Sequence, residues 1–245
     1  MALMLCCSQL LLNYKIYIMK AYKISKCFSL LIVFFLLFVQ AKSQEKQEDK
    51  ITASTQVLKD FGAMKESIPE QLLKVTEGII IVPRLINGGF VLAAKRGKGI
   101  AMVKLADGSW SNPVFVTITG GSVGLQAGVQ SVDLVLIFKK AETLQKIGKG
   151  SFTLGGDISA TAGPVGRNST ASTDYKMEAE VYSYSRSKGL FAGISLSGSA
   201  ISVDSKANEA FYGKAVDAKD LFSNSKENEK ASVTEMKSEL NSLYK

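Results

Sequence analysis

A glycine-rich block between residues 88 and 204 most restricts the folds open to this chain. Short runs of apolar and β-branched residues alternate there with glycines and turn signals such as Asp107-Gly108. Runs of this length and composition are typical of β-strands joined by tight turns. The block therefore predicts a mainly β domain of the α+β class, an antiparallel β-sandwich or a small barrel of short glycine-rich strands.

Helices are predicted on both sides of this block. Apolar residues recur at near-helical spacing from Ile51 to Ile68, and again on one face of residues 231–244. Inside the block, apolar runs flank residues 95–99, which predicts that this basic, glycine-containing segment forms a hairpin turn. No change of composition interrupts residues 51–245, so we expect one domain.

Residues 1–43 are predicted to be a secretory signal peptide. Lysines precede an apolar run at 28–39, and small residues occupy the −3 and −1 positions of a cut after Ser43. The run has about 12 residues, whereas a membrane span needs roughly 20; a retained N-terminal anchor stays an open alternative. Met19 is favoured as the start. Residues 44–50 would then begin the mature chain as a flexible leader.

The cysteines and most of the net positive charge lie in that N-terminal segment. All three cysteines precede the proposed cut, so the mature domain would lack disulfides, which suggests export to a bacterial envelope, either periplasmic or secreted. The whole chain has a formal net charge of +8, but residues 44–245 hold 25 basic and 22 acidic residues, a net of +3. A nucleic-acid partner is therefore not expected.

The residue types present restrict the possible chemistry. The chain has no histidine, which excludes Ser-His-Asp and Cys-His catalysis and zinc sites built on imidazole. Glycines at 120–124 and 148–151 match no phosphate-loop or dinucleotide pattern, so we expect no cofactor and no metal. Asp133 lies among apolar residues, where a carboxylate needs a partner. A catalytic or cation-binding role stays open for it beside structural pairing, but we expect a non-enzymatic protein.

Basic residues of the predicted loops are the candidate binding residues. Arginine and lysine on loops can hold phosphate groups, although charge for solubility is an equal alternative. The predicted head-group-binding residues are Lys95, Arg96, Lys98, Arg167, Arg186 and Lys188.

The first predicted helix offers a second way to contact lipid. Its apolar face, with Val57, Leu58 and Phe61, could enter a membrane interface. A helix beside a β core usually packs on that core, so packing is the favoured alternative.

Several motifs resemble the SYLF domain family of lipid-binding proteins. They are Gly88-Gly89-Phe90-Val91-Leu92, Trp110-Ser111-Asn112-Pro113, Gly120-Gly121-Ser122-Val123-Gly124 and, most closely, Tyr184-Ser185-Arg186-Ser187-Lys188-Gly189-Leu190-Phe191. The resemblance covers the predicted domain at 51–213, starting near residue 52, and leaves 214–245 outside it as a helical C-terminal tail.

The resemblance implies a non-enzymatic domain that binds membrane lipid. Eukaryotic members bind phosphoinositides or other anionic phospholipids, and some also bind actin, whereas bacterial members look like exported single-domain proteins. Together with the basic loops, this predicts peripheral association with an anionic phospholipid membrane. A structural module that binds another envelope protein is the alternative.

Overall fold

The computed structural model describes residues 44–64, 68–163, 179–187, 190–191, 194–226 and 230–243, without the side chains of 90–93, 122–127, 149 and 191. The chain separates into two compact units, Met1–Glu45 and Lys46–Lys245, and all described residues except 44 and 45 belong to the second unit. The predicted signal peptide lies outside the described residues, as do Arg167 and Lys188.

Two long antiparallel strands form a ribbon at the centre of the unit. β1 (Gly78–Val103) pairs with β2 (Val114–Phe138), and the register is irregular between Val82 and Leu85 and between Gly89 and Val91. Strands of 26 and 25 residues are much longer than the short strands that the sequence suggested. The segment 95–99, predicted as a turn, therefore lies inside β1.

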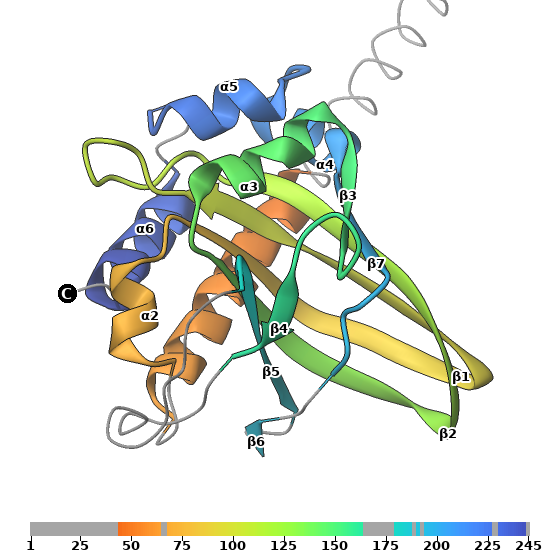
Figure 1. Cartoon of the computed structure of the whole chain (residues 1–245). Coiled ribbons are helices and arrows are strands. Elements are labelled where there is room, and N and C mark those ends of the chain that lie inside the picture. The colour runs from red at the N-terminus through yellow and green to blue at the C-terminus, as the bar shows by residue number, and fades with distance from the viewer. Residues whose placement is uncertain are drawn as a thin grey trace, which may run out of the picture. The chain divides into compact units, whose positions relative to one another are not determined.

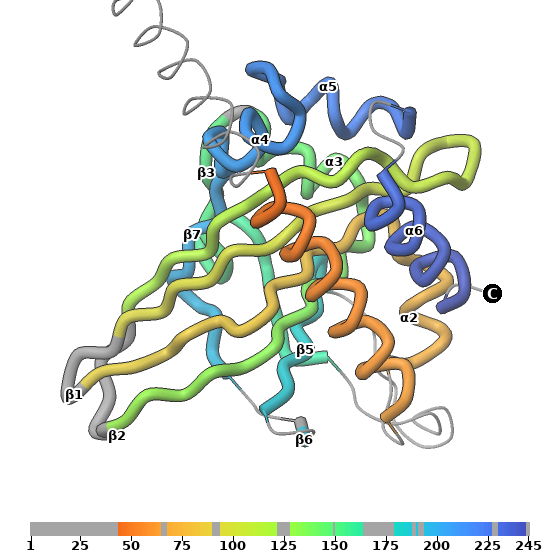
Figure 2. Tube along the Cα trace, turned by 180° about the vertical axis from the view of Figure 1, so that it is seen from behind, coloured from red at the N-terminus to blue at the C-terminus, as the bar shows by residue number. Residues whose placement is uncertain are grey.

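The ribbon folds back on itself at a place that glycine makes possible. A Cβ atom on Gly99 would lie 2.0 Å from the carbonyl oxygen of Ile81, and one on Gly97 would lie 2.6 Å from the side chain of Leu85. The two halves of β1 therefore face each other at a separation that no larger residue allows. Figure 2 shows the two halves running side by side from the tip of the ribbon.

Shorter strands continue the sheet from both halves of β2. β7 (Ser199–Val203) pairs with its first half and β5 (Val181–Ser187) with its second half. The remaining strands are β3 (Ser151–Leu154), β4 (Ala160–Ala162) and β6 (Leu190–Phe191). The result is a seven-stranded sheet, antiparallel except where β4 meets β5, which curves towards a barrel (Figure 1).

Helices cover the outer face of this sheet. Residues 44–62 are helical and cross the ribbon, as Figure 2 shows. α2 (Glu70–Lys74), α4 (Ser205–Tyr212) and α6 (Ala231–Leu243) contribute buried side chains to the same outer core. α3 (Ala141–Gln145), the 3₁₀ turn Lys146–Lys149 and α5 (Ala218–Ser223) pack instead on the inner core. The predicted α+β, mainly β class with helices at both ends is confirmed.

Alternating side chains divide the interior into two cores. Ile80 and Leu136 point into the curved sheet, whereas their neighbours Ile81 and Val135 point outwards beneath the helices. Because both faces of the strands are buried here, the segments read as continuous apolar runs in the sequence. This alternation also fixes which polar residues share the outer face further along the ribbon.

The N-terminal segment of the described chain differs from its prediction. Residues 44–50, predicted as a flexible leader, continue the helix towards the N-terminus. The segment is rich in Gln, Glu and Lys, which are good helix formers. Gln47 is buried, and Lys230 forms an ion pair with Glu48. No helix in the described ranges is long and apolar enough to cross a membrane.

Candidate anion-binding face

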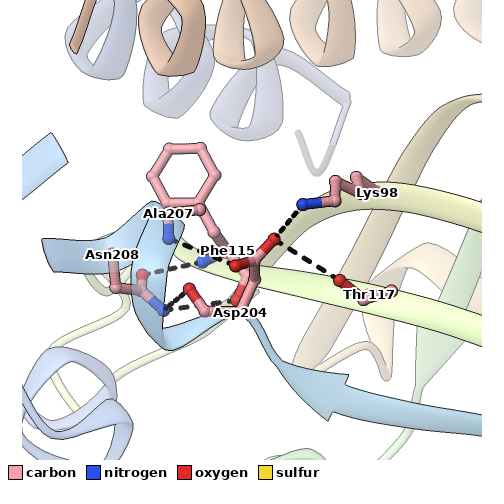
Figure 3. Close-up of polar contacts among 6 residues, drawn as sticks. All are labelled: Lys98, Phe115, Thr117, Asp204, Ala207 and Asn208. Atoms are coloured by element: carbon pink, nitrogen blue, oxygen red, sulfur yellow. Dashed lines mark hydrogen bonds and ion pairs between the residues drawn. The ribbon is translucent and has the colours of Figure 1, made fainter. Parts of the chain in front are cut away.

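Lys98 is held on the outer face of β1 by the N-terminal cap of α4. Its Nζ donates to Oδ2 of Asp204 at 2.6 Å, and Oγ1 of Thr117 lies 3.5 Å from the same oxygen (Figure 3). The other carboxylate oxygen of Asp204 accepts the backbone N–H of Ala207 at 3.2 Å. Asp204 therefore caps the helix and positions the lysine at once.

A buried amide holds that cap against the sheet. Oδ1 of Asn208 accepts the backbone N–H of Phe115 at 2.9 Å, and its Nδ2 donates to the carbonyl oxygens of Phe115 and Asp204 (Figure 3). Asn208 is 1% exposed, so these bonds replace those it would make to water. These bonds fix α4 to β2, so the carboxylate of Asp204 that pairs with Lys98 is held in place.

A depression of about 220 Å³ opens beside Lys98, between the N-terminal helix and β1. The residues that line it are Lys46, Asp49, Lys50, Ala53, Pro83, Arg84 and Lys98. Four of them are basic and one is acidic. Helix residues 46 and 50 are four apart and so lie on one face of the helix, towards the strand. We call this surface the basic depression.

The basic depression carries unbalanced positive charge. Burial, and then the charge of Lys98, lower the pKa of Lys50 below its ordinary value, although Asp204 acts in the opposite direction. Arg84 and Lys46 also lower the pKa of Lys50. Cations that disfavour one another's charge would be stabilised by a bound anion.

Arg84 reaches the basic depression from an irregularity in β1. The residue has a φ of 54°, in the left-handed region that non-glycine residues rarely adopt. Its backbone N–H donates to Oδ1 of Asp133 at 3.0 Å, while the other oxygen of Asp133 accepts Nη2 of Arg186 at 2.9 Å. A strained conformation of this kind persists only where surrounding contacts fix it, and it is common at binding sites.

Arg186 also links this irregularity to the N-terminal helix. Its Nη2 lies 2.5 Å from Oδ2 of Asp60, and its guanidinium lies over the ring of Phe61. Burial by itself raises the pKa of Asp60, but hydrogen bonds from Gln56 and Arg186 outweigh it, so this pKa lies below its ordinary value. We call Asp60, Arg186 and Asp133 the clamp.

The predicted head-group-binding residues are not brought together as one loop cluster. Arg96 and Lys98 are exposed on the outer face of β1, two residues apart. Lys95 points the other way, is 4% exposed and donates to the carbonyl oxygen of Ser195. Since 95–99 is strand rather than turn, successive side chains face opposite sides, and Lys95 cannot reach a ligand on the outer face.

Arg186, predicted as a head-group-binding residue, forms ion pairs within the protein. Its side chain is 16% exposed and lies between two carboxylates, so it supports Arg84 rather than presenting itself to a head group. Asp133 likewise forms the structural pairing, one of the alternatives that the sequence left open for it.

The apolar residues predicted to enter a membrane are buried in the outer core. Val57 is 4% exposed, Leu58 0% and Phe61 1%. They pack between the helix and the ribbon, which is the favoured alternative of the sequence analysis. In this structure the three side chains are inaccessible to lipid, because the helix docks through the very face that would insert.

Three residues of the basic depression were not predicted as site residues from the sequence: Lys46, Lys50 and Arg84. The four-residue spacing of Lys46 and Lys50 indicates that both would lie on one face of a helix. This signal was not used, because residues 44–50 were predicted to be a flexible leader. Arg84 gave no local signal, because only the pairing of β1 with β2 shows the irregularity that exposes it.

Comparison with known proteins identifies the family. The family described as Ysc84, Las17-binding protein actin regulator, matches residues 119–243. LAS seventeen-binding protein 3 of Saccharomyces cerevisiae is 37% identical over 186 residues, which are 74% of this chain and 40% of that protein. Human SH3 domain-containing YSC84-like protein 1 is 33% identical over 182 residues, 74% of this chain and 53% of that protein.

The chain thus matches about half or less of the length of these relatives. The family match extends through α6 and so includes most of the segment 214–245 that the sequence resemblance left out. More than half of the chain matches the family, and the resemblance to SYLF proteins is confirmed: the chain belongs to the Ysc84 family of SYLF domain proteins.

Proposed function

We propose that this protein is a non-enzymatic module that associates with anionic phospholipid head groups through the basic depression. The observation that carries the proposal is the gathering of Lys46, Lys50, Arg84 and Lys98 around one concave surface. Phosphate oxygens are acceptors that suit lysine and arginine donors. Lys98 and Arg84 are each held in place from behind, by Asp204 and by the clamp.

Three observations make binding a better proposal than catalysis. Asp133 is engaged by Arg186 and by the N–H of Arg84, so it is not poised as a general acid or base. The chain has no histidine. The basic depression itself presents cations and one carboxylate, without a nucleophile and base within reach of each other.

A protein partner is the second candidate. The names of the yeast relative and of the family describe binding to Las17. A module of this family can therefore carry a protein-binding surface, and for this chain we keep the predicted partner in the envelope. Export by the signal segment, followed by peripheral association with the membrane, stays part of this proposal.

Vesicle binding by charge-matched variants tests the lipid proposal. The full-length protein is mixed with neutral vesicles and with vesicles containing phosphatidylglycerol, over a series of salt concentrations. One variant carries Lys46→Gln, Lys50→Gln and Arg84→Asn, since asparagine tolerates the left-handed backbone of residue 84. The control carries Lys140→Gln, Lys146→Gln and Lys219→Gln, which are exposed residues beside the inner core.

The control is needed because the five lysines of residues 1–43 also attract anionic lipid. Each basic residue near an anionic surface contributes about 1 kcal/mol, so the site variant should bind at least about tenfold more weakly. The control should bind like the unmodified protein, and the difference should shrink as salt screens it. Equal binding by the two variants would refute the basic depression as the lipid site.

A further inference from the structure

The outer face of the ribbon continues beyond the helices that cover it. Near the helices it carries the buried side chains of the outer core, such as Ile81 and Val135. Towards the tip, the same face carries Ile86, which is 45% exposed, and Val129, which is 78% exposed. Among the described residues, four large apolar side chains are exposed, and these are two of them.

Strand register places these two side chains together. Ile86 pairs with Ser131, and Gly88 pairs with Val129, so Ile86 and Val129 are diagonal neighbours on one face. A Cβ atom on Gly88 would lie 3.0 Å from Cγ2 of Val129, which shows that the valine side chain extends across the glycine. We call Ile86 and Val129 the apolar pair.

Basic residues lie next to the apolar pair on the same outer face, because Gly97, between Arg96 and Lys98, lies against Leu85. Arg84 is two residues before Ile86, at the edge of the basic depression, and Arg96 and Lys98 face outwards from the other half of β1. Within the described ranges, the side chains of Arg84 and Arg96 belong to no ion pair. The nearby carboxylates of Asp133 and Asp204 are already held, by Arg186 and Lys98.

We infer that the apolar pair is a membrane anchor that enters the hydrocarbon edge of an anionic bilayer while Arg84 and Arg96 stay among the head groups. An apolar tip with cations behind it matches the order of a bilayer surface, where phosphates lie outside the acyl chains. The inference rests on the proposed function and deepens it. A phosphate ion free in solution would contact the cations alone, whereas a bilayer also contacts the apolar pair. It also replaces the first helix, whose apolar face is buried, as the inserting element.

Two kinds of variant test the anchor in the full-length protein. The first is Ile86→Ser with Val129→Ser, and its control is Val75→Ser. Val75 is 46% exposed and ends α2, which lies at the opposite end of the ribbon (Figure 1). Both are mixed with phosphatidylglycerol vesicles at low and high salt. The double variant should bind about tenfold more weakly at both salt concentrations, because loss of an apolar contact is not screened. The control should bind normally.

The second variant, Val129→Trp, reports insertion directly. The chain's one native tryptophan, Trp110, is 1% exposed, so a fluorescence change on vesicle addition comes from position 129. We expect a shift to shorter wavelength, and quenching by lipids brominated on their acyl chains. Absence of quenching while binding to anionic vesicles persists would overturn the anchor and leave the proposed function standing.

Other outcomes separate the two proposals. Loss of binding by the basic-depression variant, with normal binding by the double serine variant, also overturns the anchor alone and makes a protein partner the occupant of the apolar pair. Equal binding by the basic-depression variant and its charge control refutes the proposed function, and with it the anchor that depends on it.

Discussion

The carboxylate of Asp133 accepts the backbone N–H of Arg84 at 3.0 Å, across the first irregularity in the pairing of β1 with β2. This bond fixes a residue whose φ of 54° is otherwise unfavourable. Arg186 completes the arrangement by holding Asp133 from the side of β5 and Asp60 from the N-terminal helix. The partly buried side chain of Arg186 thus connects the helix that carries Lys46 and Lys50 with the strand that carries Arg84.

Arg186→Gln should therefore weaken both stability and binding. The substitution leaves two carboxylates close together without their common cation, which should lower the free energy of unfolding by about 1–3 kcal/mol. Denaturation by urea measures this change. The control is Lys59→Gln, which removes an ion pair to Glu235 whose partners are 42% and 53% exposed, and it should change little. Equal stability of the two variants would show that the clamp contributes nothing.

Stability should fall in acid because of Asp60 and Asp204. Burial raises the pKa of Asp204, but Lys98 and the N–H of Ala207 lower it more, so it lies below its ordinary value. The pKa of Asp60 is lowered as well. Below about pH 4 the unfolded chain therefore takes up protons first, and the stability present at neutral pH is lost as the pH falls through the folded-state pKa values.

Urea denaturation between about pH 5 and pH 2 checks this prediction. Asp204→Asn should make the dependence of unfolding free energy on pH less steep than in the unmodified protein. An unchanged slope would mean that Lys98 and the α4 cap do not favour the ionised carboxylate.

Substitutions of the neighbouring residues Lys95 and Arg96 should differ in their effect on vesicle binding. Desolvation lowers the pKa of Lys95, so burying its charge is unfavourable. Lys95→Met keeps an unbranched apolar side chain, one atom shorter than lysine, and removes this cost. The unfolding free energy should therefore change by less than about 1.5 kcal/mol, and vesicle binding should not change. Arg96→Gln should leave stability intact and weaken binding to anionic vesicles. Weaker binding by Lys95→Met would contradict the inward orientation of Lys95.

Phe61→Ala should destabilise the fold rather than remove a membrane contact. Phe61 is 1% exposed between the helix and the ribbon, and truncating a buried phenylalanine costs about 3–5 kcal/mol. Val75→Ala, at an exposed position, should cost less than about 0.5 kcal/mol. Chemical denaturation of both variants gives the comparison. A stable Phe61→Ala variant that no longer bound vesicles would instead support insertion by the first helix.

The spacing of apolar residues along the sequence was sufficient to indicate several strands and the helices at the two ends. Ile79–Val82 and residues 132–138 are continuous runs of mostly apolar residues, the pattern typical of buried strands, and both are parts of β1 and β2. The helices at the two ends followed from apolar spacing, because a single face of each packs on the sheet. The class of fold follows from such patterns alone.

The glycine content of residues 95–99 led to the wrong prediction of a turn, because these glycines serve a contact between distant parts of β1. Gly97 and Gly99 looked like turn residues between two strands, but they lie within β1 and allow its two halves to approach. Nothing near them in the sequence distinguishes a turn from a close crossing, because the atoms that exclude a larger side chain belong to Val82, Leu85 and Ile81.

The amino-acid sequence by itself determined the family, the mainly β class and the supply of basic residues. Only the tertiary structure decided which of those residues share a surface. Lys50, Arg84 and Lys98 meet because a helix docks on a ribbon that has folded over itself, and Lys95 is turned away by the alternation of one strand. Such placement depends on contacts between segments tens of residues apart, which local propensity and spacing do not encode.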